Sequence, residues 1–262
     1  MVINKSIVIE LAKNGKRVDG RGLTDFREPV TVEVGITKSA EGSARVTIGE
    51  TEVLVGVKLS VEKPYPDSPD KGGIMVNAEL TPLSNPNYDP GPPQIKAIEL
   101  SRVVDRGIRE SHAIDVKELC ITPGEQCWFV AIDIVAVNDA GNLFDAAGLG
   151  AMAALKNAKL PEVDENGVID YMKRTDKSLP VSKEALPVTV RKIQGQFVVD
   201  PLFIEEQAVD ARLTVASTAD GSIVALQKGG DAPFSIEEIG NIVDIALEKA
   251  KFLREKLNQA LR

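Results

Sequence analysis

Cysteine and histidine are scarce in this sequence. Its 262 residues include two cysteines and one histidine, His112. A disulfide framework needs more cysteines in a shorter chain, and a zinc site needs further ligands of these two types. A lone imidazole also disfavours a Ser-His or Cys-His nucleophile arrangement. We therefore expect no metal site and no bound cofactor, with Cys120 and Cys127 as core thiols of a reducing compartment.

Long apolar runs are missing as well. No stretch of about 18 apolar residues occurs, and charges interrupt the N-terminal segment before a signal peptide's apolar region is complete. We therefore expect a soluble, cytoplasmic protein. The composition, 43% hydrophobic and 27% charged, is typical of a globular fold with one large domain or two small ones.

Positive charge is the third deficit. The chain has 31 Lys and Arg against 39 Asp and Glu, a formal net charge of −8. A net anion is repelled by phosphates, so this global count disfavours a nucleic-acid partner. Screening at physiological salt, however, confines the influence of each charge to roughly 8 Å, so a few local arginines are still able to act.

The apolar pattern predicts a meander of strands followed by helices in the first part of the chain. Residues 64–93 hold eight of the fifteen prolines around one apolar run, which predicts an irregular loop that encloses a strand. The next helix is predicted to carry Pro92 and Pro93 in its first turn. The predicted strands span residues 30–35, 44–49, 52–59, 73–80, 118–122 and 127–137, and the predicted helices span residues 92–112 and 143–156.

The second half repeats the first. Residues 188–190 resemble residues 30–32, residues 211–215 resemble residues 44–48, and each pair is followed by a further strand. The last helix starts at a capping box, Ser235 to Glu238, and runs to the C-terminus. These patterns predict an α+β fold built by duplication, two strand meanders each backed by helices.

A charged, turn-rich segment separates the two halves. Residues 161–187 show no sustained periodicity beyond residues 168–172. We predict a first half at 1–160, a surface connector at 161–187 and a second half at 188–262.

Three arginines share one face of the first long helix. At 100° per residue, Arg102, Arg106 and Arg109 fall within about 60° of one another. One interpretation is a phosphate-backbone site, because the planar guanidinium suits phosphate oxygens. The other is a solvated face whose arginines pair with acidic residues of the same helix, Glu99, Asp105 and Glu110.

Other charged segments are less specific. The turn Arg17-Val18-Asp19-Gly20-Arg21 is typical of cations that pair with nearby carboxylates, and Lys228-Gly229-Gly230-Asp231 either ends a strand or forms an anion-binding nest. Neither matches a P-loop or a dinucleotide fingerprint. Spacing cannot rank the candidate acid/base carboxylates, which are Asp139, Asp145, Asp200, Glu205, Glu206 and Asp210.

Four segments in order resemble the ribonuclease PH family: RVDGRGLTDFRE, YPDSPDKGG, NPNYDPGPPQ and ELSRVVDRGIRE. Within it the sequence is most similar to the non-catalytic ring subunits of the archaeal exosome. The resemblance implies a duplicated fold of the ribosomal protein S5 domain 2-like type. It also implies six-membered rings that degrade RNA from its 3′ end, with inorganic phosphate as the attacking group.

Active members of that family carry a phosphate-holding Gly-Ser/Thr-Arg turn and a nearby acidic residue. The segment that resembles this turn reads Asp139-Ala140-Gly141-Asn142-Leu143-Phe144-Asp145, so the hydroxyl and the arginine are missing. Leucine and phenylalanine donate no hydrogen bond to phosphate, and Asp145 would repel it. The resemblance further implies that Asp210 is a remnant of one family carboxylate.

We therefore expect a chain that is inactive by itself and completes a catalytic sister subunit as a heterodimer. Three dimers would form a hexameric ring that carries RNA-binding cap subunits, and inorganic phosphate would be the co-substrate of the partner. Arg102, Arg106 and Arg109 would hold the backbone of single-stranded RNA. Two alternatives remain: an active ribonuclease PH-like enzyme, and a purely structural ring component without RNA contact. A divalent-ion requirement is left open.

Overall fold

A mixed sheet forms the first half of the fold. The computed structural model describes residues 5–163 and 169–262. In this sheet the strand order is β1-β2-β3-β6-β4, with β5 paired to β6, and only β4 runs parallel to its neighbour. Alternate side chains of β3 are buried, as expected of a strand with one face on the core. The strands are β1 (Val30–Val34), β2 (Gly42–Ile48), β3 (Thr51–Glu62), β4 (Gly73–Glu79), β5 (Cys120–Thr122) and β6 (Gln126–Asn138).

An antiparallel sheet of order β10-β9-β11-β12 forms the second half. Its central strand pair, β9–β11, repeats the register of the β1–β2 hairpin. Val30 lies opposite Ile48 in β1–β2, and Val188 lies opposite Val215 at the equivalent place in β9–β11. The predicted duplication is therefore confirmed down to the pairing of individual residues. The strands are β9 (Leu186–Ile193), β10 (Gln196–Val199), β11 (Ala211–Ser217) and β12 (Ile223–Gly230).

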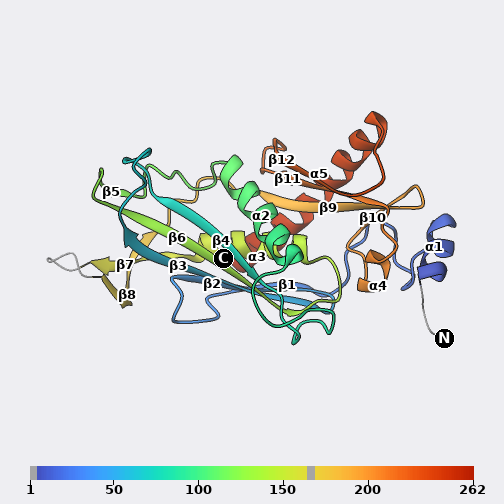
Figure 1. Ribbon diagram of the computed structural model, residues 1–262, viewed down its shortest axis with the longest axis horizontal. Helices are drawn as coiled ribbons and strands as arrows, with labels where there is room; N and C mark the ends of the chain where they lie inside the picture. The colour runs from blue at the N-terminus through green and yellow to red at the C-terminus, as the bar shows by residue number, and fades with distance from the viewer. Residues whose placement is uncertain (1–4, 164–168) are drawn as a thin grey trace.

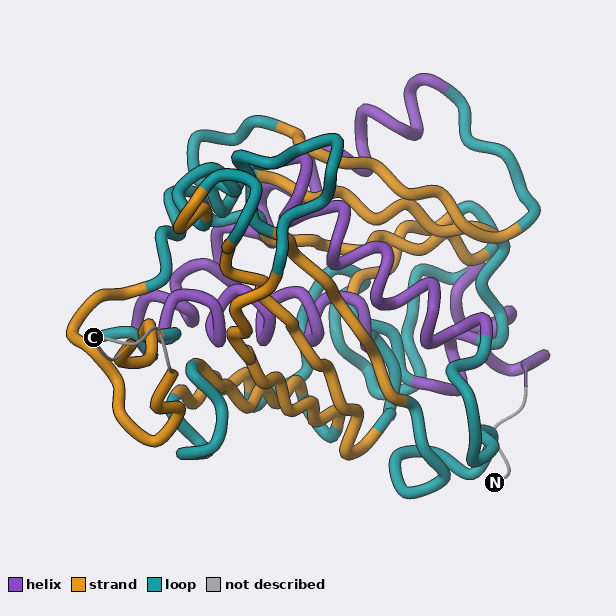
Figure 2. Tube along the Cα trace, turned by 60° about the vertical axis from the view of Figure 1, so that its left-hand side comes forward, coloured by secondary structure: helices purple, strands orange, loops and turns teal. Residues whose placement is uncertain are grey.

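Helix α3 (Leu143–Asn157) lies between the two sheets and contacts β2, β3 and β9 (Figures 1 and 2). Almost all of its side chains are buried, because the helix is covered on every side. This explains why its residues are apolar nearly all round. Its small residues set the packing distance. A Cβ on Gly148 would lie 2.1 Å from Cγ of Pro187, and a Cβ on Gly150 would lie 2.8 Å from Cγ2 of Val55.

Two amphipathic helices cover the remaining faces. Helix α2 (Ile95–Glu110) packs against β4, α3 and β12, and α5 (Ile236–Ala260) packs against β9, β11 and β1. The predicted capping box of α5 is confirmed, because Glu238 N donates to Ser235 Oγ over 3.1 Å. One detail of the α2 prediction was wrong: both prolines precede its N-cap, Gln94, and the helix ends at Glu110.

Several short elements were not predicted. They are α1 (Lys5–Lys13), β10 and α4 (Phe203–Glu206). The expected connector also contains regular structure, because β7 (Lys159–Val163) pairs with β8 (Ile169–Ser178) as an antiparallel hairpin. Arg174 of this hairpin donates to the carbonyl oxygens of Lys38 and Ala40. Val168, the first residue of the expected periodic stretch, lies outside the described residues, and the domain limits remain predictions.

Both cysteines are free, and they lie opposite each other in the β5–β6 pair. Burial raises the pKa of the Cys127 thiol, as expected of an inert core residue. Among the described helices, none is long and apolar enough to cross a membrane.

Candidate functional site

The segment that resembles a phosphate turn joins β6 to α3, and buried side chains hold its backbone. Arg27 donates from Nη1 to Ala140 O and from Nη2 to Gly141 O, each over 2.8 Å. Thr51 Oγ1 donates to the same Gly141 oxygen over 2.6 Å. Gly141 has φ +107° and a Cβ there would lie 2.3 Å from Pro201 O, so only glycine fits. The turn is therefore rigid.

The polar groups of the turn are already occupied by protein groups. Asn142 N donates to Glu206 Oε1 over 3.0 Å, and Asn142 Oδ1 accepts from Arg191 Nη1 over 3.0 Å. Asn142 Nδ2 donates to Asp145 Oδ2 over 3.0 Å, and Gly141 N donates to Asp139 Oδ1 over 3.0 Å. A phosphate would have to displace carboxylates from these donors. The geometry thus agrees with the expected loss of phosphate recognition at this turn.

Asp145 acts inside the protein and not at its surface. Its carboxylate is fully buried, and Oδ1 accepts from Thr189 N of β9 over 2.8 Å. Burial raises the pKa of this carboxyl to about 7, although the Arg191 guanidinium opposes the shift. Asp145 was expected to repel a phosphate at the turn, but its side chain does not line the cavity beside the turn. It instead links α3 of the first half to β9 of the second.

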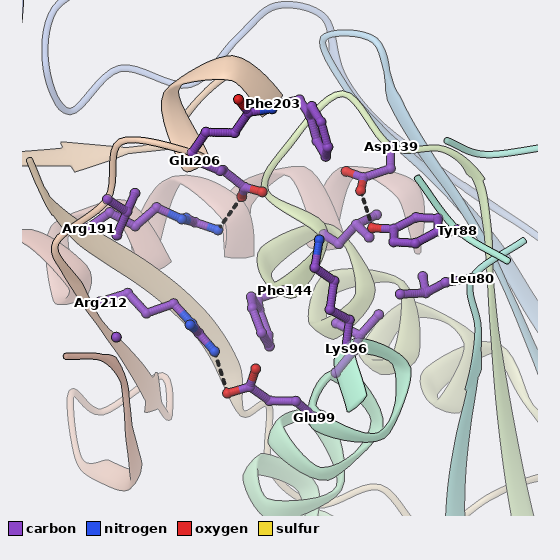
Figure 3. A pocket seen from close by; sticks show the side chains of 15 residues that line it. Leu80, Tyr88, Lys96, Glu99, Asp139, Phe144, Arg191, Phe203, Glu206 and Arg212 are labelled. Carbon is purple, nitrogen blue, oxygen red and sulfur yellow. Dashed lines mark hydrogen bonds and ion pairs between the residues drawn. The ribbon is translucent and has the colours of Figure 1, made fainter. Parts of the chain in front are cut away.

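A cavity of about 330 Å³ lies beside the turn, between the two halves (Figure 3). Arginines from adjacent strands form one wall, and each is paired with a carboxylate. Arg191 lies 2.8 Å from Glu206, and Arg212 forms an ion pair with Glu99 of α2. Arg212 also lies 4.9 Å from the centroid of the Phe144 ring. Phe144 thus stands in the turn at a place where a phosphate ligand would be expected. Its aromatic ring packs against the Arg212 guanidinium instead.

The opposite wall carries Tyr88, Asp139 and Lys96. The hydroxyl of Tyr88 donates to Asp139 Oδ2, and burial together with this carboxylate raises the pKa of the tyrosine. Lys96 Nζ lies 5.5 Å from the centroid of the Tyr88 ring and 6.0 Å from that of Phe203. Figure 3 shows its ammonium group pointing into the cavity.

The sequence did not single out Lys96, Glu99, Arg191 or Arg212 as parts of this cavity. Arg191 offered a signal in the sequence, because it is a charged residue that directly follows the largely apolar run Leu186–Val190 of a strand. Lys96, Glu99 and Arg212 are brought together at the cavity only by tertiary packing. Asp210 is not brought to the cavity: its Oδ2 accepts from Gln194 N over 2.7 Å at the β9–β10 turn.

The arginines of the N-terminal turn pair with carboxylates, as their pattern predicted. Arg17 forms a buried ion pair with Glu205, with Nη2 2.5 Å from Oε2. Arg27 and Arg21 both contact Asp200, over 2.8 and 3.2 Å. Asp200 and Glu205 are thus structural partners of these arginines. Within the described residues, no group of three or more His, Cys, Asp or Glu is placed to hold a metal ion.

The three arginines of α2 differ in their partners. Arg109 is held by Asp105 over 2.7 Å and donates to Ile74 O over 3.0 Å, and the hydrogen bond that it donates to the Asp105 carboxylate raises the pKa of Arg109. Among the described residues, the side chain of Arg106 donates only to the neutral Gln227, over 2.7 Å. Arg102 is exposed and has no hydrogen bond or ion pair within residues 5–163 and 169–262. The solvated-face interpretation therefore holds for Arg109, whereas Arg102 and Arg106 keep their charge available.

Family models match both halves of the chain. Domain 1 of the 3′ exoribonuclease family, the RNase PH family, matches residues 26–161, and domain 2 matches residues 185–249. The chain belongs to the RNase PH family of 3′ exoribonucleases. This confirms the family resemblance of the sequence and the duplicated α+β fold.

Relatives that are similar over nearly the full chain carry the name exosome complex component Rrp42. The chain is 44% identical to the exosome complex component Rrp42 of Thermococcus onnurineus, over 99% of this chain and 96% of that protein. It is 46% identical to the component of the same name from Methanosarcina acetivorans, over 96% and 92%.

Solved structures agree with this family. A chain of the Archaeoglobus fulgidus exosome with RNA bound to the active site superposes with a TM-score of 0.89 at 42% identity, over 96% of both chains. A chain of an archaeal exosome core gives 0.86 at 39% identity, over 97% of this chain and 96% of that one. Rice Rrp46, at 18% identity and a TM-score of 0.70, shares the fold.

Proposed function

We propose that this chain is a non-catalytic subunit of an archaeal exosome ring, a phosphorolytic 3′→5′ exoribonuclease complex of the cytoplasm. It pairs with a catalytic RNase PH-like subunit, and three such pairs form a hexameric ring that carries RNA-binding caps. Inorganic phosphate is the co-substrate of the partner, and this chain binds no cofactor of its own. The full-length similarity to the archaeal Rrp42 components supports this assignment.

One observation carries the non-catalytic part of the proposal. The amide and side chain of Asn142, which lie where a phosphate would be held, are bonded to Glu206, Asp145 and Arg191. The sequence Leu143-Phe144 adds no hydroxyl and no guanidinium. An attacking phosphate would thus meet carboxylates and an aromatic ring.

The ring subunit holds RNA through α2. Arg102 and Arg106 are one helical turn apart on an exposed face, and neither is paired with a carboxylate in the part of the chain that the structure describes. Contacts of this kind go to the phosphate backbone and are independent of base identity, as a processive nuclease requires. Arg109 plays a smaller part because Asp105 holds its guanidinium.

The test is phosphate-dependent degradation of RNA by the isolated chain and then by the chain with its catalytic partner. We expect degradation only with the partner. Replacing both Arg102 and Arg106 by Glu should weaken RNA binding of the assembled ring without dissociating it. A matched control exchanges the exposed Lys13 and Lys251, on α1 and α5, for Glu, which changes the net charge equally.

Each alternative predicts a different result. Robust activity of the isolated chain would show an active RNase PH-like enzyme and overturn the proposal. Unchanged RNA binding in the Arg102 and Arg106 variant would show a structural ring component without RNA contact. Equal loss in the lysine control would mean that overall charge, and not the α2 face, governs RNA binding.

A further inference from the structure

Three cations and three carboxylates line the cavity beside the turn, and two of each form ion pairs. Arg191 pairs with Glu206 and Arg212 with Glu99, while the Asp139 carboxylate accepts hydrogen bonds from the neutral donors Tyr88 and Gly141 N. Lys96 alone among the lining cations has no carboxylate partner in the described residues, and its ammonium contacts only the Tyr88 and Phe203 rings. The cavity thus offers one cation that is not engaged in an ion pair.

The rest of the lining suits a planar group. Phe144 and Phe203 lie on either side of the Lys96 ammonium in Figure 3, and Leu80 adds to the apolar wall. Every nucleobase has a face that stacks on aromatic rings, whatever its sequence identity. The paired arginines and carboxylates around the rings supply donors and acceptors for the edge of a base.

The size of the cavity limits the ligand. Its volume of about 330 Å³ is at the lower end of the range for small-molecule sites. A single nucleotide fits such a volume, whereas an RNA chain does not. A second cavity of about 210 Å³ meets it at Tyr88 and Lys96, which leaves room for a phosphate beside the ammonium.

We propose that this cavity binds a nucleoside monophosphate, with the base against Phe144 or Phe203 and the single phosphate on Lys96. A second phosphate would meet Asp139 or Glu206 without a further free cation. Inorganic phosphate has no base that could stack on the phenylalanine rings. The backbone N–H groups of Gly141 and Asn142 in the turn are already hydrogen-bonded to carboxylates. The predicted order of affinity is therefore AMP above ADP and adenosine, with phosphate weakest.

The test is calorimetric titration of the isolated full-length chain with AMP, ADP, adenosine and phosphate. Lys96 is exposed, so Lys96→Met leaves the fold intact and should weaken AMP binding about tenfold, towards the affinity for adenosine. Phe203→Leu should weaken AMP and adenosine alike because both lose the stacking face. Lys117→Met, at an exposed lysine outside the cavity, is the matched control and should change nothing.

Three results would overturn the proposal. They are no saturable binding of AMP, AMP binding that neither Lys96→Met nor Phe203→Leu weakens, and binding of ADP or phosphate as tight as that of AMP. If a short RNA displaces AMP, binds more tightly than AMP and is weakened by Lys96→Met, the cavity belongs to the RNA path instead. The Arg102 and Arg106 variant should bind AMP like the parent chain, so this test is independent of the α2 face.

Discussion

The β1–β2 hairpin of the first half and the β9–β11 strand pair of the second share a register but differ in charge. Glu33 lies opposite Arg45 in the first pair, and at the equivalent place Arg191 lies opposite Arg212 in the second. The first pair is local: Arg45 lies 3.7 Å from Glu33 and 3.2 Å from Glu52, and its side chain is 44% exposed. The second places two like charges side by side, which is unfavourable without outside partners.

Those partners come from other elements. Glu206 belongs to α4 and Glu99 to α2, so each arginine of the β9–β11 pair ties its strand to a different part of the fold. A duplicated backbone has thus diverged in its charges. The ion pairs of Arg45 stay within the first sheet, whereas those of Arg191 and Arg212 reach helices outside the second sheet, and only the Arg212–Glu99 pair joins the two halves.

Asp145 gives the test with the largest expected effect. This residue of α3 accepts a hydrogen bond from Thr189 N of β9, so it too holds the second strand pair from outside its sheet. Its pKa is raised from the ordinary 3.8 to about 7, so between these values the folded protein binds a proton that the unfolded chain lacks. The free energy of unfolding should fall as the pH rises through this window, by about 1.4 kcal/mol for each pH unit. Urea unfolding between pH 4 and pH 8 measures it.

Asp145→Asn is the control, since its amide keeps an acceptor for Thr189 N and has no proton to bind. Other carboxylates titrate in both proteins and cancel in the difference. The parent chain should lose stability relative to the variant as the pH rises. Parallel curves would contradict a buried carboxyl with a raised pKa.

The sequence could predict the elements with strong periodicity. Alternation in Thr51–Glu62 and the capped apolar stripe of Ile236–Ala260 are local signals, and both elements were predicted. The β7–β8 hairpin was missed because its strands are largely exposed and charged, so no apolar alternation marks them. Helix α4 has four residues, too few for any helical period.

The candidate site was predictable only in part. The altered turn could be found from the sequence because the missing hydroxyl and arginine are local facts. The pairing of Arg212 with Glu99 joins residues 113 positions apart, so no spacing rule detects it. The exposed face of α2 was predicted from a helical wheel, but its division into Arg109, held by Asp105, and the freer Arg102 needed the structure.

Arg191→Met should produce the next largest effect. The side chain of Arg191 is 3% exposed, and its loss leaves Glu206 and Asn142 without their shared donor. Breaking a fully buried pair costs about 3–5 kcal/mol, and the 30% exposure of Glu206 reduces this to roughly 2–4 kcal/mol. Arg45→Met, in the β1–β2 pair at the position equivalent to Arg212, should cost less than about 1 kcal/mol. Equal losses in urea unfolding at neutral pH would show that the two strand pairs do not differ.

Gly148→Ala probes the contact between α3 and the second sheet. The added Cβ would lie 2.1 Å from Cγ of Pro187, whose ring cannot rotate away. We expect a loss of about 1–3 kcal/mol in unfolding free energy. Gly240→Ala is the matched helical control: nothing lies within 4 Å of its Cβ, and it should gain about 0.5–1 kcal/mol. The comparison fails if both substitutions stabilise the protein.

The smallest expected effects come from double-mutant cycles on two ion pairs. Glu33 with Arg45 should give a coupling of about 0.2–1 kcal/mol, because both side chains are largely exposed. Glu99 with Arg212 should couple more strongly, because the Arg212 side chain is 19% exposed and its guanidinium lies against the Phe144 ring. In about 1 M salt, where the screening length falls to about 3 Å, the first coupling should vanish and the second persist. If the two couplings fall in parallel with added salt, the Glu99–Arg212 pair is screened as strongly as the Glu33–Arg45 pair. The ion pair between the halves would then contribute no more to stability than a surface ion pair does.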